Sequence, residues 1–256
     1  MSTYSKAGVD IDAGNTAVEL MKAHLKKARR PEVIGDIGGF AGLFDVSALK
    51  KFKKPLLATS TDGVGTKTEI ARQLGKYDTI GEDLVAMVVD DLVVCGAEPL
   101  FMTDYIAVGK VFPERIAEIV KGISNGCAKA GTALIGGETA EHPGLLGEDE
   151  FDIAGAATGA VDAENLLGAD KIKSGDLLIA MPASGFHANG YSLIRYILQK
   201  NNLNLDSTLD SKTLGEYLLT PTEIYSLDCL ALIKGLKDSL HGFSHITGGG
   251  LRSEEH

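Results

Sequence analysis

The chain has 256 residues, of which 44% are hydrophobic, and a formal net charge of −10. This length allows one large domain or two smaller ones, and the dispersed acidic charge argues against a nucleic-acid-binding surface. No segment approaches the length of a membrane span, and the N-terminus lacks a signal-peptide pattern, so we expect a soluble cytoplasmic protein. Cys95, Cys127 and Cys229 form no Cys-x-x-Cys pair, which argues against a disulfide framework or a zinc site.

The first elements in chain order are a polar arm and a helix with a basic end. Residues 4–14 are polar and contain glycine, which predicts an extended arm or loop. Apolar residues at helical spacing predict a helix over residues 16–30, which Pro31 ends. The basic cluster at its end is interpreted as a solvated face that complements the helix dipole, with phosphate attraction as the alternative.

A strand that ends in a glycine-rich loop is the central pattern of the chain. The apolar run from Leu56 stops at Asp62-Gly63-Val64-Gly65-Thr66-Lys67. The glycines let the backbone approach a ligand, Lys67 supplies a positive charge, and Asp62 supplies an oxygen for a divalent cation. The spacing differs from a Walker A motif because a threonine precedes the lysine. The loop suits a metal-bound polyphosphate, and an ordinary hairpin or strand-to-helix turn is the alternative.

An apolar helix that carries acidic residues is predicted over residues 77–97. It is apolar nearly all round, so it should be buried. Asp83, Asp90 and Asp91 lie seven or eight positions apart, which puts them on one face. A buried carboxylate needs a partner. That partner is either a cap or salt bridge to a basic neighbour, or a metal-phosphate site shared with Asp62.

The next elements repeat the strand-to-loop pattern. We predict a strand over 101–108, a helix from Pro113 to the residue before Gly131, and a strand over 132–135. This strand runs into a glycine-rich acidic loop, residues 136–144, in which Glu138 and Glu141 can ligate a metal or act as bases. A strand of small residues over 151–161 implies close approach of another backbone.

A polar stretch over residues 162–175 marks a domain boundary near residue 167, which divides the chain into domains 1–166 and 167–256. A strand over 177–181 and a glycine-containing loop precede a helix over 191–199, which is a natural anion site. Ser184 and Asn189 add donors there, His187 is a candidate substrate contact, and a helix cap is the alternative role of Asn189.

The chain closes with a turn over residues 218–225, a helix that continues through residue 236, and a glycine loop over 245–250. Two strands and two helices are few for a second domain, so we expect that domain to continue beyond residue 256.

In this order and spacing, the motifs resemble the aminoimidazole ribonucleotide (AIR) synthetase family, also called phosphoribosylformylglycinamidine cyclo-ligase. They occupy residues 7–15, 30–32, 61–67, 91–94, 96–101, 136–141, 189–193 and 245–251. The resemblance implies a two-domain α/β (α+β) fold and a homodimer whose N-terminal strands form a barrel-like sheet. It also implies ATP-dependent, Mg²⁺-dependent ring closure of formylglycinamidine ribonucleotide.

The resemblance also assigns site residues. Catalytic roles fall to Lys67, His187 and Glu141, and metal binding falls to Asp62, Asp91 and Glu138. The nucleotide and phosphate contacts are Asp62, Gly63, Gly65, Thr66, Lys67, Ser184 and Asn189.

Asp90 departs from the family pattern, which has Asn at that place. The runner-up enzymes share the ATP-binding architecture: selenophosphate synthetase, whose reactive N-terminal cysteine is missing here, and thiamine-monophosphate kinase. A non-catalytic nucleotide-binding or dimerisation module is the alternative from a different class.

Overall fold

A four-stranded mixed sheet organises the first part of the chain. The computed structural model describes residues 11–35 and 41–251. The strands lie in the order β3 (Pro55–Gly63), β6 (Phe151–Asp162), β4 (Glu98–Val108) and β5 (Ala133–Glu141). β6 pairs antiparallel with β3 and β4, and β5 pairs parallel with β4. The small side chains of β6 allow it to occupy an inner position of this sheet, as its composition predicts.

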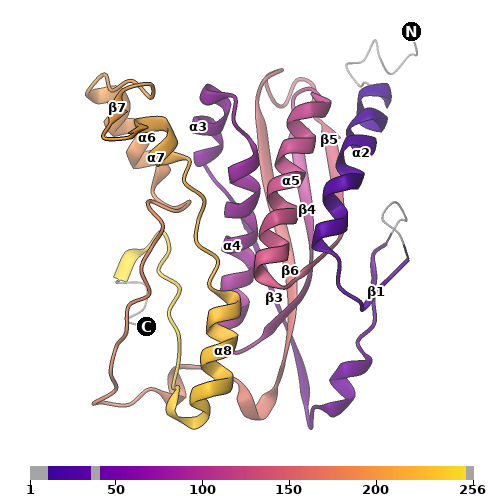
Figure 1. Ribbon diagram of the computed structural model, residues 1–256, viewed down its shortest axis with the longest axis vertical. Coiled ribbons are helices and arrows are strands. Elements are labelled where there is room, and N and C mark those ends of the chain that lie inside the picture. The colour runs from indigo at the N-terminus through magenta and orange to yellow at the C-terminus, as the bar shows by residue number, and fades with distance from the viewer. Residues whose placement is uncertain (1–10, 36–40, 252–256) are drawn as a thin grey trace.

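Three helices cover one face of the sheet (Figure 1): α2 (Ile11–Leu25), α4 (Asp78–Val94) and α5 (Pro113–Ala130). The predicted helices over 77–97 and from Pro113 are confirmed. The prediction of an arm over 4–14 is wrong for residues 11–14, which begin α2, and its other residues lie outside the described ones. The shorter elements here are η1 (Lys26–Ala28), β1 (Val33–Ile34), β2 (Leu43–Phe44), η2 (Ser47–Lys51) and α3 (Lys67–Leu74).

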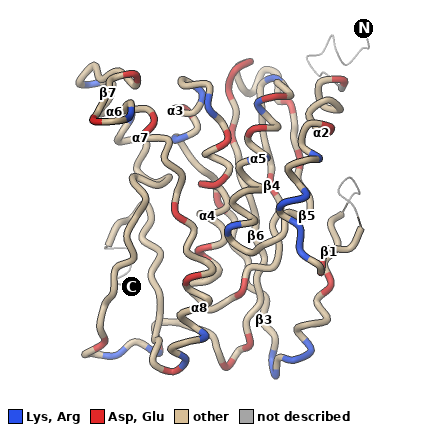
Figure 2. The backbone as a smooth tube through the Cα atoms, in the orientation of Figure 1, with Lys and Arg blue, Asp and Glu red and all other residues tan. Residues whose placement is uncertain are grey.

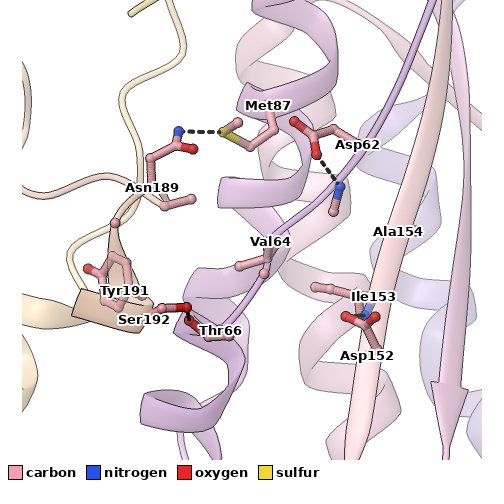
Figure 3. Close-up of a pocket in the computed structure, with 14 residues that line it drawn as sticks. Asp62, Val64, Thr66, Met87, Asp152, Ile153, Ala154, Asn189, Tyr191 and Ser192 are labelled. Atoms are coloured by element: carbon pink, nitrogen blue, oxygen red, sulfur yellow. Dashed lines mark hydrogen bonds between the residues drawn. The ribbon is translucent and has the colours of Figure 1, made fainter. Parts of the chain in front are cut away.

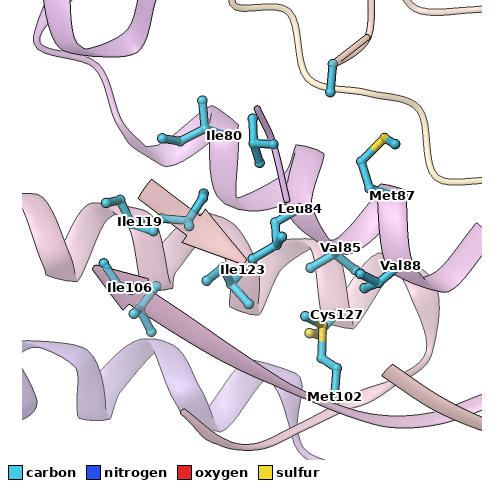
Figure 4. Packing of buried hydrophobic residues seen from close by; sticks show 14 of the residues in the cluster. Ile80, Leu84, Val85, Met87, Val88, Met102, Ile106, Ile119, Ile123 and Cys127 are labelled. Carbon is cyan, nitrogen blue, oxygen red and sulfur yellow. The ribbon is translucent and has the colours of Figure 1, made fainter. Parts of the chain in front are cut away.

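The core lies between these helices and the sheet. In Figure 4, apolar side chains of α4 meet those of α5 over Met102 and Ile106 of β4. The two helices cross at glycines: a Cβ built on Gly122 would lie 1.9 Å from the carbonyl oxygen of Asp78 and 3.1 Å from Cα of Gly81. Only glycine permits this backbone approach, which brings the acidic helix α4 tightly onto α5.

β5 extends farther than predicted. Residues 136–141 were expected in a loop, but they continue the strand and pair with Thr103–Val108 of β4. A Cβ on Gly137 would lie 1.6 Å from Oδ1 of Asp104, so glycine makes room for that side chain. The local glycine content predicted a loop, but the neighbouring strand supplies partners for the backbone.

Asp104 is a carboxyl group on the helix-covered face of β4. Burial raises its pKa to about 7 from 3.8. Between about pH 4 and pH 7 the folded protein therefore keeps a proton that the unfolded chain releases, and this group lowers stability as pH rises through that window. Asp104→Asn removes the titration. The substitution should be more favourable near pH 8 than near pH 4 by about 2–4 kcal/mol in the free energy of unfolding. Urea unfolding at both pH values tests this, and an equal effect at both would contradict it.

The second part of the chain packs beside the first (Figure 1). Its helices are α6 (Tyr191–Lys200), α7 (Leu214–Leu218) and α8 (Ser226–Leu236), with a small hairpin of β7 (Thr208–Leu209) and β8 (Lys212–Thr213). Short 3-10 turns lie at η3 (Ala163–Asn165), η4 (Ala169–Lys171) and η5 (Lys237–Ser239). The turn before a helix ending at residue 236 is confirmed, and α8 contacts α4 and α5.

The strand expected over 177–181 is not formed. This segment is irregular, and Leu177, Leu178 and Ile179 are 90%, 99% and 87% exposed. The apolar pattern alone predicted a strand, but among the described residues no neighbouring strand pairs with it. A strand needs such a partner for its backbone groups.

The basic residues that follow α2 hold neighbouring segments of the chain. Figure 2 shows basic residues gathered at the end of α2, where Arg30 donates hydrogen bonds to the carbonyl oxygens of Pro99 and Gly131.

The three cysteines are free, as expected. Cys127 and Cys229 are buried, and the carbonyl oxygen of half-buried Cys95 accepts a hydrogen bond from the backbone N–H of Leu167. No helix within the described residues is long and apolar enough to cross a membrane.

Candidate functional site

A pocket of about 510 Å³ lies where β3 ends, beside the N-terminal end of α6 (Figure 3). This volume is within the range of small-molecule sites. Its walls come from the loop after β3, from the start of β6, from α4 and from the loop before α6. The lining residues are Asp62, Gly63, Val64, Gly65, Thr66, Met87, Asp152, Ile153, Ala154, Ala188, Asn189, Gly190, Tyr191 and Ser192.

Glycines shape the two loops that face each other across this pocket. Gly65 and Gly190 have φ values of 66° and 79°, in the left-handed region that favours glycine. Gly190 is the N-cap residue of α6, so the positive end of that helix lies at the pocket wall. The loops also touch: the hydroxyl groups of Thr66 and Ser192 lie 3.1 Å apart. Glycine-rich backbone and a helix N-terminus suit a phosphate group.

Five of the predicted site residues line this pocket: Asp62, Gly63, Gly65, Thr66 and Asn189. The Oδ1 atom of Asp62 accepts a hydrogen bond from the backbone of Gly63, and the amide of Asn189 points at the sulfur of Met87, 3.7 Å away. Figure 3 shows Asp62 and Asn189 on opposite walls. The other predicted residues, Lys67, Ser184, His187, Asp91, Glu138 and Glu141, are not among the lining residues.

His187 and Ser184 lie in the loop that leads to this wall. The backbone N–H of Ser184 donates to Nε2 of His187 at 3.1 Å, and its hydroxyl group donates to the carbonyl oxygen of Pro221 at 2.6 Å. Burial, followed by the charges of Lys67 and His245, lowers the pKa of His187. Because Nε2 accepts a hydrogen bond, the ring is neutral and carries its proton on Nδ1.

Asp91 is held by two neighbours from different parts of the chain. Its carboxylate accepts a hydrogen bond from the hydroxyl group of Ser60 at 2.9 Å and lies 2.9 Å from Nδ1 of His245. The bond from His245 lowers the pKa of Asp91. Burial alone would lower the pKa of His245, but the bond to Asp91 and the charges of Asp90, Asp91 and Asp62 raise it. The side chains of Asp62 and Asp91 therefore both lie near one imidazole ring.

Asp83 and Asp90 are held by the second part of the chain. Asp83 forms a buried salt bridge with Lys67, and Asp90 accepts hydrogen bonds from the backbone N–H of Tyr225 at the start of α8. Burial raises the pKa of Asp90 to about 7. The salt-bridge interpretation is confirmed for Asp83, whereas Asp90 is satisfied by the backbone N–H of Tyr225.

Glu138 and Glu141 lie outside the pocket. Glu138 pairs with Tyr105, three strands away from Gly63, which corresponds to about 14 Å. The side chain of Glu141 accepts a hydrogen bond from the backbone N–H of Val111 at 2.7 Å, just before α5. Within one chain the structure therefore does not bring Glu138 to Asp62 and Asp91.

The donor set fits a metal ion that arrives with a phosphate group. Among residues 11–35 and 41–251, no group of three His, Cys, Asp or Glu side chains could hold a metal ion alone. Mg²⁺, however, commonly binds through one or two carboxylates together with substrate phosphates and water. Asp62 in the pocket wall, with Asp91 nearby, meets this smaller requirement.

Family models match both parts of the chain. Residues 45–161 match the model described as AIR synthase related protein, N-terminal domain, and residues 173–254 match the model described as AIR synthase related protein, C-terminal domain. The chain belongs to the AIR synthase family. The resemblance drawn from the sequence motifs and the expected α/β fold are thereby confirmed.

Curated members of the AIR synthase family are similar over nearly the whole chain. A phosphoribosylformylglycinamidine cyclo-ligase of Desulfitobacterium hafniense is 55% identical over 249 residues, which cover 97% of this chain and 73% of that protein. A protein of the same name from Geobacillus kaustophilus is 53% identical and is covered to 72%. The chain thus spans about three quarters of these relatives.

Solved structures share the fold at lower identity. Thiamine-monophosphate kinase from Stenotrophomonas maltophilia has a TM-score of 0.57 and 22% identity, covering 85% of this chain and 63% of that one. The E. coli hydrogenase maturation protein HypE has a TM-score of 0.52 and 18% identity, covering 86% and 60%. At this identity the likeness concerns the fold alone.

Several residues in and beside this pocket were not predicted from the sequence. Ser192, which contacts Thr66, lies inside the motif at residues 189–193, and that position was the available signal. His245 likewise opens the final glycine motif, but only the fold brings it to Asp91. Nothing in the local sequence around Asp152 indicated that it would line the pocket.

Proposed function

We propose that this chain carries out the ATP-dependent ring closure of formylglycinamidine ribonucleotide to aminoimidazole ribonucleotide, a step of purine biosynthesis. The observation that carries the proposal is the 55% identity to a phosphoribosylformylglycinamidine cyclo-ligase over 97% of the chain. The pocket adds physical support, because two of the family-like motifs, at residues 61–67 and 189–193, meet in it. In the expected division into domains 1–166 and 167–256, each domain would supply one wall of the pocket.

The proposed chemistry requires an amide oxygen to become a leaving group. When bound, ATP supplies the phosphoryl group that makes this oxygen leave as phosphate after the amidine nitrogen attacks the carbon. The protein contributes mainly positioning and charge neutralisation. Backbone N–H groups of residues 64–66 and the start of α6 would face the phosphates, while Thr66, Asn189 and Ser192 would orient them.

Acidic and imidazole groups have separate proposed roles. Asp62 and Asp91 would hold Mg²⁺ beside the phosphates. Neutral His187 would orient the substrate or move a proton during cyclisation. The contributions of Glu138, Glu141 and Ser184 stay predictions; Glu138 lies on the uncovered face of the sheet, so a second copy of the chain would have to bring it to a site.

We also propose that the uncovered sheet face forms a homodimer interface. This face presents Thr61 and Thr103 on either side of Ala156, and Leu57 on it is 67% exposed. Small side chains occupy the centre of this face, with Glu138 on the outer strand β5, and such a centre is suited to association. The barrel-like sheet expected from the resemblance would form across it.

Ala156→Lys should convert the dimer into a monomer, because it places a charge in the centre of that face. Sedimentation velocity measures the change, with circular dichroism to verify the fold. Ala169→Lys, at an exposed site outside the sheet, is the matched control and should leave the dimer intact. Dimers that persist in Ala156→Lys would exclude this face as the interface.

The activity is tested by ADP release from the purified chain in Mg²⁺, with and without formylglycinamidine ribonucleotide, alongside detection of the aminoimidazole product. Substrate-dependent ADP matched by ring product is the expected result. ADP formed with thiamine monophosphate instead would favour the kinase alternative. Saturable Mg-ATP binding without turnover would favour a non-catalytic nucleotide-binding module.

A further inference from the structure

Lys67 follows the glycine loop in sequence, yet it is buried and is not among the residues that line the pocket. Both Lys67 and Asp83 are 0% exposed, and Nζ of Lys67 lies 2.9 Å and 2.8 Å from the two carboxylate oxygens of Asp83. The ammonium group also lies 5.4 Å from the ring centre of Tyr191. A charge at this place was predicted to meet a phosphate, but the fold encloses it.

The hydrogen bonds of Lys67 use its whole donor capacity. Besides Asp83, Nζ donates to the carbonyl oxygens of His187 at 2.7 Å and Thr220 at 2.8 Å. An ammonium group has three donors and no acceptor, so this set matches the charged form. Oδ1 of Asp83 accepts two further bonds from Thr222, one from its backbone and one from its hydroxyl group. Lys67 therefore has no free donor.

This network joins the two parts of the chain at the pocket. Lys67 and Asp83 belong to α3 and α4, whereas His187, Thr220 and Thr222 belong to the two loops flanking α6 and α7. His187 has a φ of 56°, a left-handed conformation that costs energy for a residue with a side chain. Its carbonyl oxygen is held by Lys67, and the wall of the pocket begins at the next residue, Ala188.

We propose that Lys67 is a positioning residue: its ammonium group, held on Asp83, fixes the backbone at His187 and Thr220 so that residues 188–192 form the pocket wall, and it makes no contact with phosphate. Only the kinetic test of this inference rests on the proposed function; the exchange test does not. Breaking the network removes the anchor of the strained loop, so the wall should move even when no ligand is bound.

The test is hydrogen exchange of backbone amides in the ligand-free protein, comparing wild type with Lys67→Met. Positioning predicts that exchange at residues 187–192 and 220–222 accelerates by about 10-fold or more. A phosphate ligand predicts unchanged exchange without ligand and a loss of ATP affinity only. Lys76→Met, which removes an exposed lysine with one long ion pair to Glu216, is the matched control and should leave exchange in these segments unchanged.

Lys67→Arg keeps the charge and covers the case in which Lys67→Met does not fold. A guanidinium group cannot reproduce the three bonds in this enclosed space, so positioning predicts faster exchange at 187–192 here too. The phosphate-ligand reading predicts wild-type exchange in this variant, and that result would overturn the proposal.

Kinetic measurements distinguish a failure of this positioning role from a failure of the proposed function. If the wild type closes the ring, Asp83→Asn and Lys67→Met should each lower kcat/KM by about 10-fold or more, and the double variant should lose no more than either single one. Additive losses, or wild-type kinetics together with faster exchange, would overturn the positioning role. If the wild type shows no turnover, the proposed function fails, whereas the exchange result still decides whether Lys67 holds the wall.

Discussion

Gly122→Ala is expected to lower the free energy of unfolding by about 3 kcal/mol or more. The added Cβ would lie 1.9 Å from the carbonyl oxygen of Asp78, a backbone atom that cannot move without shifting α4. Because α4 carries Asp83, Asp90 and Asp91, separating it from α5 would also disturb the groups near the pocket. Urea unfolding measures the loss.

Gly235→Ala is the matched control for this helix substitution. Gly235 lies within α8, and a Cβ there would have nothing within 4 Å. Alanine in a helix interior is favoured over glycine, so this variant should be more stable by about 0.5–1 kcal/mol. A similar small gain in Gly122→Ala would show that the crossing of α4 and α5 tolerates a wider spacing.

Asp91→Asn is expected to lower kcat by about 100-fold or more in the ring-closure assay. The substitution removes the charge that faces His245, and in the proposed function it removes a ligand of Mg²⁺. Steady-state kinetics at several Mg²⁺ concentrations should show that half-maximal activity requires more Mg²⁺. Near-normal turnover would exclude Asp91 as a metal ligand.

Two control variants separate the loss of a metal ligand from the loss of a negative charge and from the loss of the pair with His245. Asp228→Asn, on the exposed side of α8, removes an equal charge away from the pocket and should leave the kinetics unchanged. His245→Gln removes the imidazole partner but keeps the carboxylate of Asp91. If Asp91 binds the metal, this variant keeps the wild-type Mg²⁺ requirement, whereas an identical shift in both variants would assign the effect to the pair with His245.

The sequence predicted elements best where a single pattern extends over many residues. The continuous apolar run of α4 and the helix starting at Pro113 needed no information about neighbours. The strand expected over 177–181 and the loop expected for residues 136–141 were wrong because backbone pairing decided both. β4 supplies partners for β5, while residues 177–181 have no paired strand within the described chain.

The site was predictable to the extent that glycine loops reveal it. Asp62, Gly65 and Asn189 do meet at one pocket, as expected of loops that follow strands or precede helices. The surroundings of Lys67 depend on Asp83, His187 and Thr220, which are 16, 120 and 153 positions away in sequence. Local spacing contains no information about burial by such distant segments.

The three cysteines differ in burial, so a thiol reagent should label them unequally. Burial raises the pKa of Cys127 and Cys229, the latter to about 11, so both remain protonated at neutral pH and enclosed. Cys95 is half-buried at the end of α4, where its carbonyl oxygen holds Leu167 between the two parts of the chain. A maleimide fluorophore would therefore attach at Cys95 in preference to the others, and its emission would report on the contact between Cys95 and Leu167.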